Sequence, residues 1–201
     1  MARIKTTKNE LKAQRDTMRR LERYLPTLQL KKTQLQVEVR VVDARIERNQ
    51  QREHALLEGL RAWVALFSDD VDFLPWLDIG RVLTDTANIA GVTVPVLREV
   101  EFQRTQPPLD TTPPWYDDAL SCLAELARLR LERRVFEEQR RLLAEELRTT
   151  NQRVNLFERV KIPECKEAIR KIRIFLGDVQ TLDVARSKLA KQKSLERETA
   201  S

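Results

Sequence analysis

The residues that could carry out catalysis are few in this chain of 201 residues. His54 is its only histidine and Cys122 and Cys165 are its only cysteines, so neither a zinc site of cysteines and histidines nor a Cys–His pair is expected. None of the four glycines belongs to a G-x-x-x-x-G-K-[ST] loop for nucleotide phosphates. We therefore predict a chain that has no catalytic residue, no cofactor, no metal ion and no nucleotide site of its own.

The remaining candidates for chemistry have simpler interpretations. Asp69, Asp70 and Asp72 lack the glycine and the terminal glutamate of a calcium-binding loop, so solvated carboxylates are expected there. His54 lies at a helix position that faces solvent. The two cysteines lie within helical patterns, which favours reduced side chains that fill space in a helix interface.

Composition and charge indicate long solvated helices that are interrupted once. Charged residues make up 34% of the chain and aromatic residues 5%, as in long helices and coiled coils. Residues 1–65 hold 15 basic and eight acidic residues (net +7), residues 66–114 hold three and eight (net −5), and residues 115–201 hold 19 and 15 (net +4), which gives the net charge of +6. Six of the eight prolines fall in the acidic middle, where they break the helical pattern.

The first basic arm, residues 1–67, has the pattern of one amphipathic helix. Thr7 and Glu10 form a capping-box pattern, which predicts a helix start near Thr7. Thirteen of 17 core positions of a heptad repeat are apolar, which predicts a left-handed coiled coil. The a positions are Leu11, Met18, Leu25, Lys32, Val39, Ile46, Glu53, Leu60 and Phe67, and the d positions are Gln14, Leu21, Leu28, Leu35, Val42, Asn49, Leu56 and Trp63. The four polar members of this set weaken the seam and can set its register.

The second basic arm, residues 114–196, has the pattern of a longer helix, which a tail at residues 197–201 follows. Thr112 is the predicted N-cap, and Pro113 and Pro114 suit the first turn, where amide donors have no helical partner. The apolar stripe of this arm consists of Leu120, Leu123, Leu126, Leu143, Leu147, Val154, Phe157, Cys165, Ile169, Ile172, Phe175, Leu176, Val179, Leu182 and Leu189.

The spacing of this stripe changes near Pro163, where Phe157, Lys161 and Cys165 follow one another at intervals of four. Such a stutter is expected to unwind the supercoil locally. If the arms form an antiparallel hairpin in which paired residue numbers add to about 185, Pro26 lies about one turn from Pro163, and both helices are expected to bend together. The same register leaves the chain beyond about residue 180 unpaired, so the C-terminal helix is expected to project past the N-terminal one.

The acidic, proline-rich middle, residues 68–113, is predicted to be a small knob at one end of the arms that contains a short β-hairpin. The alternating valines that begin at Val92 are typical of a strand, and residues 88–91 suit a turn after a first strand over residues 80–86. Pro95 lacks an amide donor, which restricts its strand to an edge or a bulge. The predicted fold class is therefore all-α dominated, with a long antiparallel two-helix coiled-coil hairpin and a small central knob.

No segment predicts a targeting signal or a membrane span. The N-terminal residues lack an apolar stretch, and no uncharged run reaches about 18 residues. We therefore expect the protein to work in the cytoplasm or on the cytoplasmic face of a membrane.

Four segments of the two arms carry motifs of a known family. Residues 149–163 are T-T-N-Q-R-V-N-L-F-E-R-V-K-I-P, residues 169–172 are I-R-K-I, residues 5–11 are K-T-T-K-N-E-L, and residues 25–32 are L-P-T-L-Q-L-K-K. Together they resemble the D subunit of V-type and archaeal-type rotary ATPases, in the bacterial branch of that family. The positions that carry the resemblance include Leu25, Pro26, Leu28, Lys31, Lys32, Arg153, Val154, Asn155, Ile162, Pro163, Ile169 and Ile172.

This resemblance implies a central rotor shaft that has no catalytic residues. Its coiled coil would insert both termini into a catalytic hexamer of subunits A and B, and its other end would bind the small F subunit and the subunit that links to the membrane ring. The shaft would couple ATP hydrolysis or synthesis to rotation and to proton or sodium transport, as a peripheral subunit at the cytoplasmic face of the membrane. The resemblance implies no cofactor, no direct nucleotide binding and no nucleic-acid partner.

Two other functions stay open when the residues are considered without the resemblance. A coiled-coil scaffold, including one that dimerises in trans, accounts for the heptads. A basic helical hairpin that binds nucleic acid accounts for the basic arms. However, acidic residues interrupt the basic clusters and aromatic residues that would stack bases are scarce, so charged faces of a coiled coil are the simpler interpretation.

Overall fold

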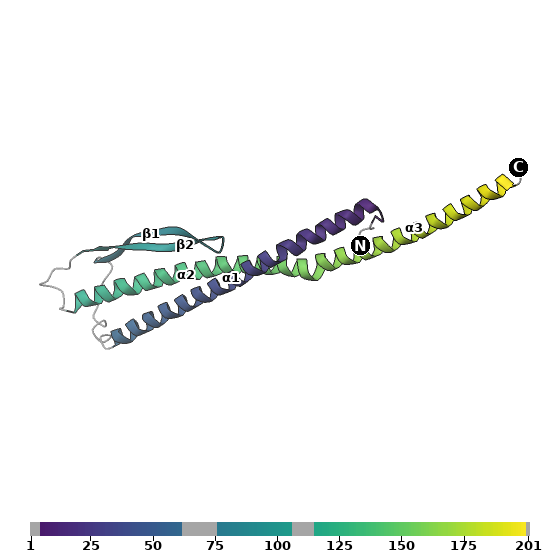
Figure 1. Ribbon diagram of the computed structural model, residues 1–201. Coiled ribbons are helices and arrows are strands. Elements are labelled where there is room, and N and C mark those ends of the chain that lie inside the picture. Colours follow the sequence, from purple (N-terminus) through teal and green to yellow (C-terminus); the bar gives the residue numbers. More distant parts are fainter. Residues whose placement is uncertain (1–4, 62–75, 106–114, 200–201) are drawn as a thin grey trace. The chain divides into compact units, whose positions relative to one another are not determined.

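The fold consists of long helices and one β-hairpin (Figure 1). The computed structural model describes residues 5–61, 76–105 and 115–199. The elements in chain order are α1 (Lys8–Arg61), β1 (Leu77–Ile89), β2 (Val92–Arg104), α2 (Tyr116–Leu156), the π-helix η2 (Phe157–Lys161) and α3 (Ile162–Thr199). The predicted fold class, an all-α dominated helical hairpin with a small β-hairpin, is confirmed. Within the described ranges, no helix is both long enough and apolar enough to cross a membrane.

The chain divides into two compact units. The terminal unit combines Met1–Leu30 with Thr150–Ser201, and the sheet unit is Lys31–Thr149. Helices α1 and α2 each contribute to both units. The predicted domain boundaries near residues 67 and 113 lie outside the described residues.

Helix α1 begins as its sequence predicts. The amide of Glu10 donates to Thr7 Oγ1 at 3.2 Å, and the amide of Leu11 donates to the Thr7 carbonyl oxygen at 3.0 Å. These bonds satisfy amide groups that the first helical turn leaves without partners. The reciprocal half of the predicted capping box is wrong, because the Glu10 carboxylate accepts from Gln14 Nε2 at 2.8 Å instead.

The predicted heptad seam of α1 is confirmed along the described helix. From Leu11 to Leu60, every predicted a or d position is buried or half-buried. The least exposed members are Leu35, Val42, Asn49 and Glu53. Two of these are polar, so the seam buries polar side chains at positions where a coiled coil ordinarily has aliphatic ones. The last two predicted core positions, Trp63 and Phe67, lie outside the described residues.

The β-hairpin of the sheet unit is longer than predicted. Its strands pair antiparallel from Leu77 opposite Arg104 to Ile89 opposite Val92. The two-residue loop between them has positive φ at Ala90 (51°) and Gly91 (80°), as a type I′ turn requires. Alanine adopts this conformation less readily than glycine does, so the loop depends on the pairing of the strands that flank it.

Packing against helices holds the β-hairpin in place. Val94 is fully buried with Leu35 and Val42 of α1 and Leu143 of α2. Gln139 Nε2 donates to the carbonyl oxygen of Pro95 at 2.6 Å. Pro95 lies on β2, and each strand of a two-stranded sheet has one edge that no other strand covers. Pro95 was predicted to lie on an edge strand or at a bulge, and it lies on an edge strand. The β-hairpin lies beside the helices of its unit rather than apart from them (Figure 1).

The predicted stutter of the second arm coincides with the π-helix η2. The amide of Ile162 donates to the carbonyl oxygen of Phe157, five residues earlier, directly before Pro163. Proline lacks an amide hydrogen and its ring collides with the carbonyl four residues back, so a widened turn before it relieves that collision. Helix α1, in contrast, stays α-helical through Pro26. The predicted common bend of the two helices stays a prediction.

Near the C-terminal end of α3, every side chain from residue 180 to residue 195 is exposed. That this stretch projects past the N-terminal helix stays a prediction. Phe175, which the predicted stripe includes, is 44% exposed, whereas the next members, Leu176 and Val179, are half-buried. Buried members of the stripe in this unit include Val154, Cys165, Ile169 and Ile172. The predicted N-cap of the second arm, Thr112, lies outside the described residues.

Candidate functional site

The two buried polar positions of the α1 seam, Asn49 and Glu53, pair with residues on α2. Glu53 is 8% exposed and accepts hydrogen bonds from Arg130 Nε at 2.9 Å and from Arg133 Nη1. Asn49 Nδ2 donates to Glu132 Oε2 at 3.0 Å. The hydrogen bond from Arg130, together with the charges of both arginines, lowers the pKa of the Glu53 carboxyl. Glu53 therefore stays ionised and holds two basic side chains of the other helix.

Further polar contacts between the two arms follow the predicted antiparallel register. In the sheet unit, Arg140 Nε lies 2.7 Å from Asp43 Oδ1, and Lys31 Nζ lies 2.6 Å from Glu146 Oε1. In the terminal unit, Gln29 Nε2 donates to Glu158. The residue numbers of these pairs add to values close to the predicted 185, so the expected pairing of the arms is confirmed.

The residues that carry the family motifs build or border the seam. Those that are buried or half-buried along it are Leu25, Leu28, Val154, Ile162, Ile169 and Ile172. Lys31 pairs with Glu146, and Lys32 and Asn155 are half-buried. Pro26, Arg153 and Pro163 are exposed. The motif is therefore chiefly a packing motif, and a contact of its exposed members with a partner stays a prediction.

Sequence reasoning missed several buried residues of the second arm. Leu129, Gln139, Thr150 and Ala168 are buried, although the predicted stripe skips them. In the sheet unit the reason is the β-hairpin, because Gln139 turns toward the Pro95 carbonyl oxygen rather than toward α1 alone. A helix that contacts two elements buries more than one stripe. The gap in the stripe between Leu126 and Leu143 was the available signal.

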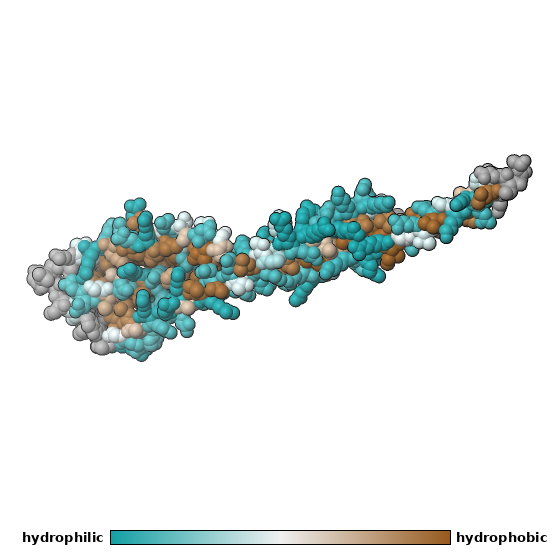
Figure 2. Space-filling model, in the orientation of Figure 1, coloured by the Kyte–Doolittle hydropathy of each residue, from teal (hydrophilic) through white to brown (hydrophobic). Residues whose placement is uncertain are grey.

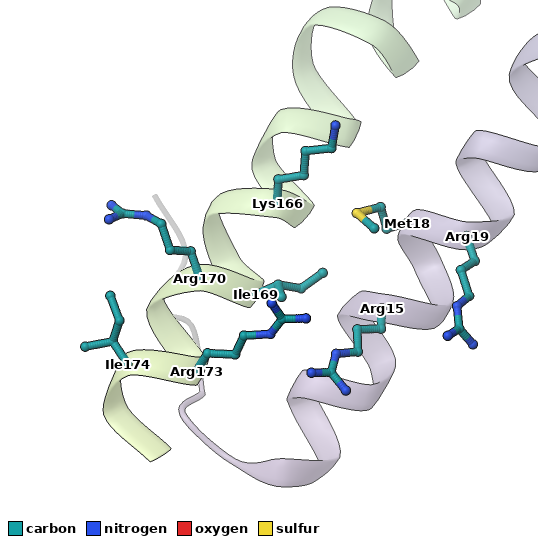
Figure 3. Close-up of a pocket in the computed structure, with 8 residues that line it drawn as sticks. All are labelled: Arg15, Met18, Arg19, Lys166, Ile169, Arg170, Arg173 and Ile174. Carbon is teal, nitrogen blue, oxygen red and sulfur yellow. The ribbon is translucent and has the colours of Figure 1, made fainter. Parts of the chain in front are cut away.

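A groove lined by basic residues lies between α1 and α3 in the terminal unit (Figure 3). It has a volume of about 710 Å³. Its basic lining residues are Arg15 and Arg19 of α1 and Lys166, Arg170 and Arg173 of α3, and its apolar ones are Met18, Ile169 and Ile174. Glu167 accepts from Arg170 at 2.9 and 3.0 Å, which lowers the pKa of that carboxyl. No Asp or Glu lines the groove among the residues that the structure describes.

The side chains most suited to catalysis are not brought together. His54 is exposed, as predicted, and its Nε2 lies 3.8 Å from Glu58 of the same helix. Both cysteines are free, as predicted, and burial raises the pKa of the Cys165 thiol. Over the described ranges, no three side chains of His, Cys, Asp or Glu form a group that could hold a metal ion. The aspartates at positions 69, 70 and 72 lie outside those ranges.

Paired long helices and a docked β-hairpin define the class of the protein as an all-α dominated helical hairpin with a small β-hairpin. Comparison with known proteins identifies the family within that class. The sequence matches the family of the ATP synthase D subunit over residues 10–192. It is 40% identical over 191 residues to the V-type ATP synthase D subunit of Borreliella burgdorferi, with 95% of each chain covered.

Two chlamydial relatives agree with this result. The chain is 38% identical over 201 residues to the V-type ATP synthase D subunit of Chlamydia caviae, with 98% of this chain and 97% of that protein covered. It is 40% identical over 197 residues to the corresponding protein of Chlamydia pneumoniae, with 94% and 92% covered. The chain therefore belongs to the ATP synthase D-subunit family. The family resemblance predicted from the sequence is confirmed.

Proposed function

We propose that this chain is the central rotor shaft of a V-type ATPase or ATP synthase. It couples ATP hydrolysis or synthesis in a catalytic head to rotation, and through rotation to proton or sodium transport. It contributes no catalytic residue itself. The proposal rests on family membership and on one structural observation, the heptad seam of α1, in which buried Asn49 and Glu53 bond to residues of α2.

That seam suits the transmission of torque. A single helix bends and twists readily, whereas two helices with interlocked side chains resist relative sliding. The ion pairs Asp43–Arg140 and Glu53–Arg130 connect the helices on the border and in the core of the seam. Each surface pair contributes little stability, but together they oppose a change of register.

The exposed end of α3 is the part that would reach furthest into a catalytic hexamer of subunits A and B. Leu182, Val184, Leu189 and Leu195 are each more than half exposed there, and apolar surface is visible along this stretch in Figure 2. Covering exposed apolar side chains with a partner is energetically favourable. Closure of one catalytic interface would then favour one angular position of the shaft, so that hydrolysis shifts the population among discrete orientations.

The sheet unit would face the other partners. We assign to it the contacts with the small F subunit and with the subunit that links to the membrane ring. Under this assignment the chain is a peripheral subunit at the cytoplasmic face of the membrane. Exposed Ile79 and Val82 on β1 offer apolar contact area for these partners.

Removal of residues 183–201 from the assembled complex tests this function. The expected result is a fall in ions transported per ATP hydrolysed, because the shaft loses its contact with the head while catalysis in the other subunits continues. A matched control keeps the length of the chain and replaces only exposed Ser187 by alanine. Ion pumping per ATP that stays unchanged after the truncation would overturn the proposal.

A further inference from the structure

The basic groove of the terminal unit combines two short rows of cations with an apolar floor. Arg15 and Arg19 lie one helical turn apart on α1, and Lys166 and Arg173 lie two turns apart on α3. At the rise of an α-helix, the rows extend about 6 Å and about 10 Å. Figure 3 shows that Met18 faces α3 between these rows and that the guanidinium groups of Arg15 and Arg173 reach toward each other.

Most of the positive charge of this groove has no acidic partner among the described residues. Arg170 pairs with Glu167, but Arg15, Arg19, Lys166 and Arg173 form no ion pair with any residue that the structure describes. Lys31 of α1, in contrast, faces α2 and pairs with Glu146 there. Guanidinium groups that approach each other without a carboxylate repel, and an anion between them removes that repulsion.

The floor of the groove favours a ligand that also has an apolar part. Ile169 is 6% exposed and Met18 is half-buried, so the base of the groove is apolar and partly dry. An aliphatic side chain would displace water from this base, and carboxylates on either side could each accept two hydrogen bonds from a guanidinium. Two or three residues of extended chain, or one to two turns of helix, span the rows.

We propose that this groove is a docking site for an acidic segment of a protein partner that carries an aliphatic side chain among its carboxylates. A nucleic acid fits less well, because its sugars and phosphates would cover the apolar floor and none of the described residues that line the groove is aromatic and able to stack a base. The identity of the partner rests on the proposed function, under which it is a subunit of the catalytic head.

Binding of a fluorescent probe peptide to the full chain tests the docking site. The probe is a short peptide of glutamates and leucines, and a peptide with glutamine in place of each glutamate is its control. The variant R15Q/R173Q is expected to weaken probe binding at least about tenfold, since two charged contacts are lost. The variant R23Q/K171Q removes the same charge from the same two helices outside the groove, and is expected to change binding less than about threefold.

Three results would overturn the docking site. In the first, both variants lose the same amount of affinity for the acidic probe. In the second, the glutamine peptide binds as tightly as the acidic probe. In the third, duplex DNA or inorganic tripolyphosphate binds the groove more tightly than the acidic probe does. Helicity measured by circular dichroism must match between the two variants, because an unfolded variant would lose binding for another reason. If R15Q/R173Q misfolds, Arg15→Lys supplies the second variant, which keeps the charge but loses bidentate contacts and is expected to weaken binding less.

The proposed docking site and the proposed rotor function can be refuted independently of each other. Probe binding to the isolated chain stands even if truncation of α3 leaves ion pumping unchanged. Conversely, impaired pumping after truncation combined with no probe binding would overturn the docking site alone. In the assembled complex, R15Q/R173Q is expected to lower the amount of head subunits retained on the shaft in raised salt more than R23Q/K171Q does.

Discussion

Glu53 of α1 and Arg130 of α2 form an ion pair in the seam of the sheet unit, with 2.9 Å between Glu53 Oε1 and Arg130 Nε. The glutamate occupies a core heptad position and is only 8% exposed. A buried carboxylate is stable only when charged or polar hydrogen bonds replace its hydration, and two arginines supply them here. The pair thus converts an unfavourable core residue into one that specifies a single register.

Replacement of Glu53 by glutamine is expected to destabilise the chain by about 1 kcal/mol, because charge-assisted hydrogen bonds become neutral ones. Urea unfolding monitored by circular dichroism measures this change. Glu47→Gln on the exposed face of α1 is the matched control, for which a change of less than about 0.5 kcal/mol is expected. Equal stabilities of the two variants would contradict the role of Glu53.

Stability is also expected to fall in acid through Glu53. Its pKa in the folded chain is lowered from the ordinary value of 4.5, chiefly by the hydrogen bond from Arg130. The folded chain therefore binds a proton less readily than the unfolded chain, so the contribution is complete above pH 4.5 and is lost as pH falls through the lowered pKa. The difference in unfolding free energy between the native chain and Glu53→Gln should shrink over this range, and a constant difference would contradict the prediction.

Docking of the β-hairpin depends on Val94. Val94→Ala removes two methyl groups from a fully buried site against Leu35 and Leu143, which is expected to cost about 1–3 kcal/mol. Hydrogen exchange should show faster exchange of amides in β1 and β2 while amides of α3 keep their protection. Val82→Ala deletes the same groups from a side chain that is 39% exposed and should leave that exchange nearly unchanged.

The two cysteines are expected to differ in reactivity. Cys165 is 6% exposed and burial raises the pKa of its thiol, so little thiolate is present and access is limited. Cys122 is half-buried and should be alkylated first by N-ethylmaleimide, as followed by mass spectrometry. Unfolding in urea should remove the difference. Equal rates in the native chain would show that the α3 seam opens readily near Cys165.

Local periodicity made the seam of α1 predictable. A heptad repeat depends only on side-chain spacing along one helix, and it assigned core positions from Leu11 to Leu60 that all prove buried or half-buried. The stutter near Pro163 was predictable for the same reason, although its form as a π-helix was not. The family was recognisable because its motif residues are contiguous in sequence.

The candidate site was less accessible to sequence reasoning. Arg15 and Arg173 are separated by most of the chain, and each is an ordinary basic residue on a charged helix. Only the pairing of α1 with α3 places them on one groove, whose described lining residues include no carboxylate. The same holds for Gln139, whose burial depends on the edge of a β-hairpin.

The sequence by itself determined two basic helical arms, their antiparallel pairing and the family, because hydrophobic period and charge are properties of neighbouring residues. Only the tertiary structure shows that Glu53 forms an ion pair with Arg130, that Val94 packs the β-hairpin against the helices, and that basic residues of α1 and α3 line one groove. These relationships join residues that are distant along the chain. They depend on which faces of the helices and of the β-hairpin pack together, and the spacing of residues along one segment does not specify that packing.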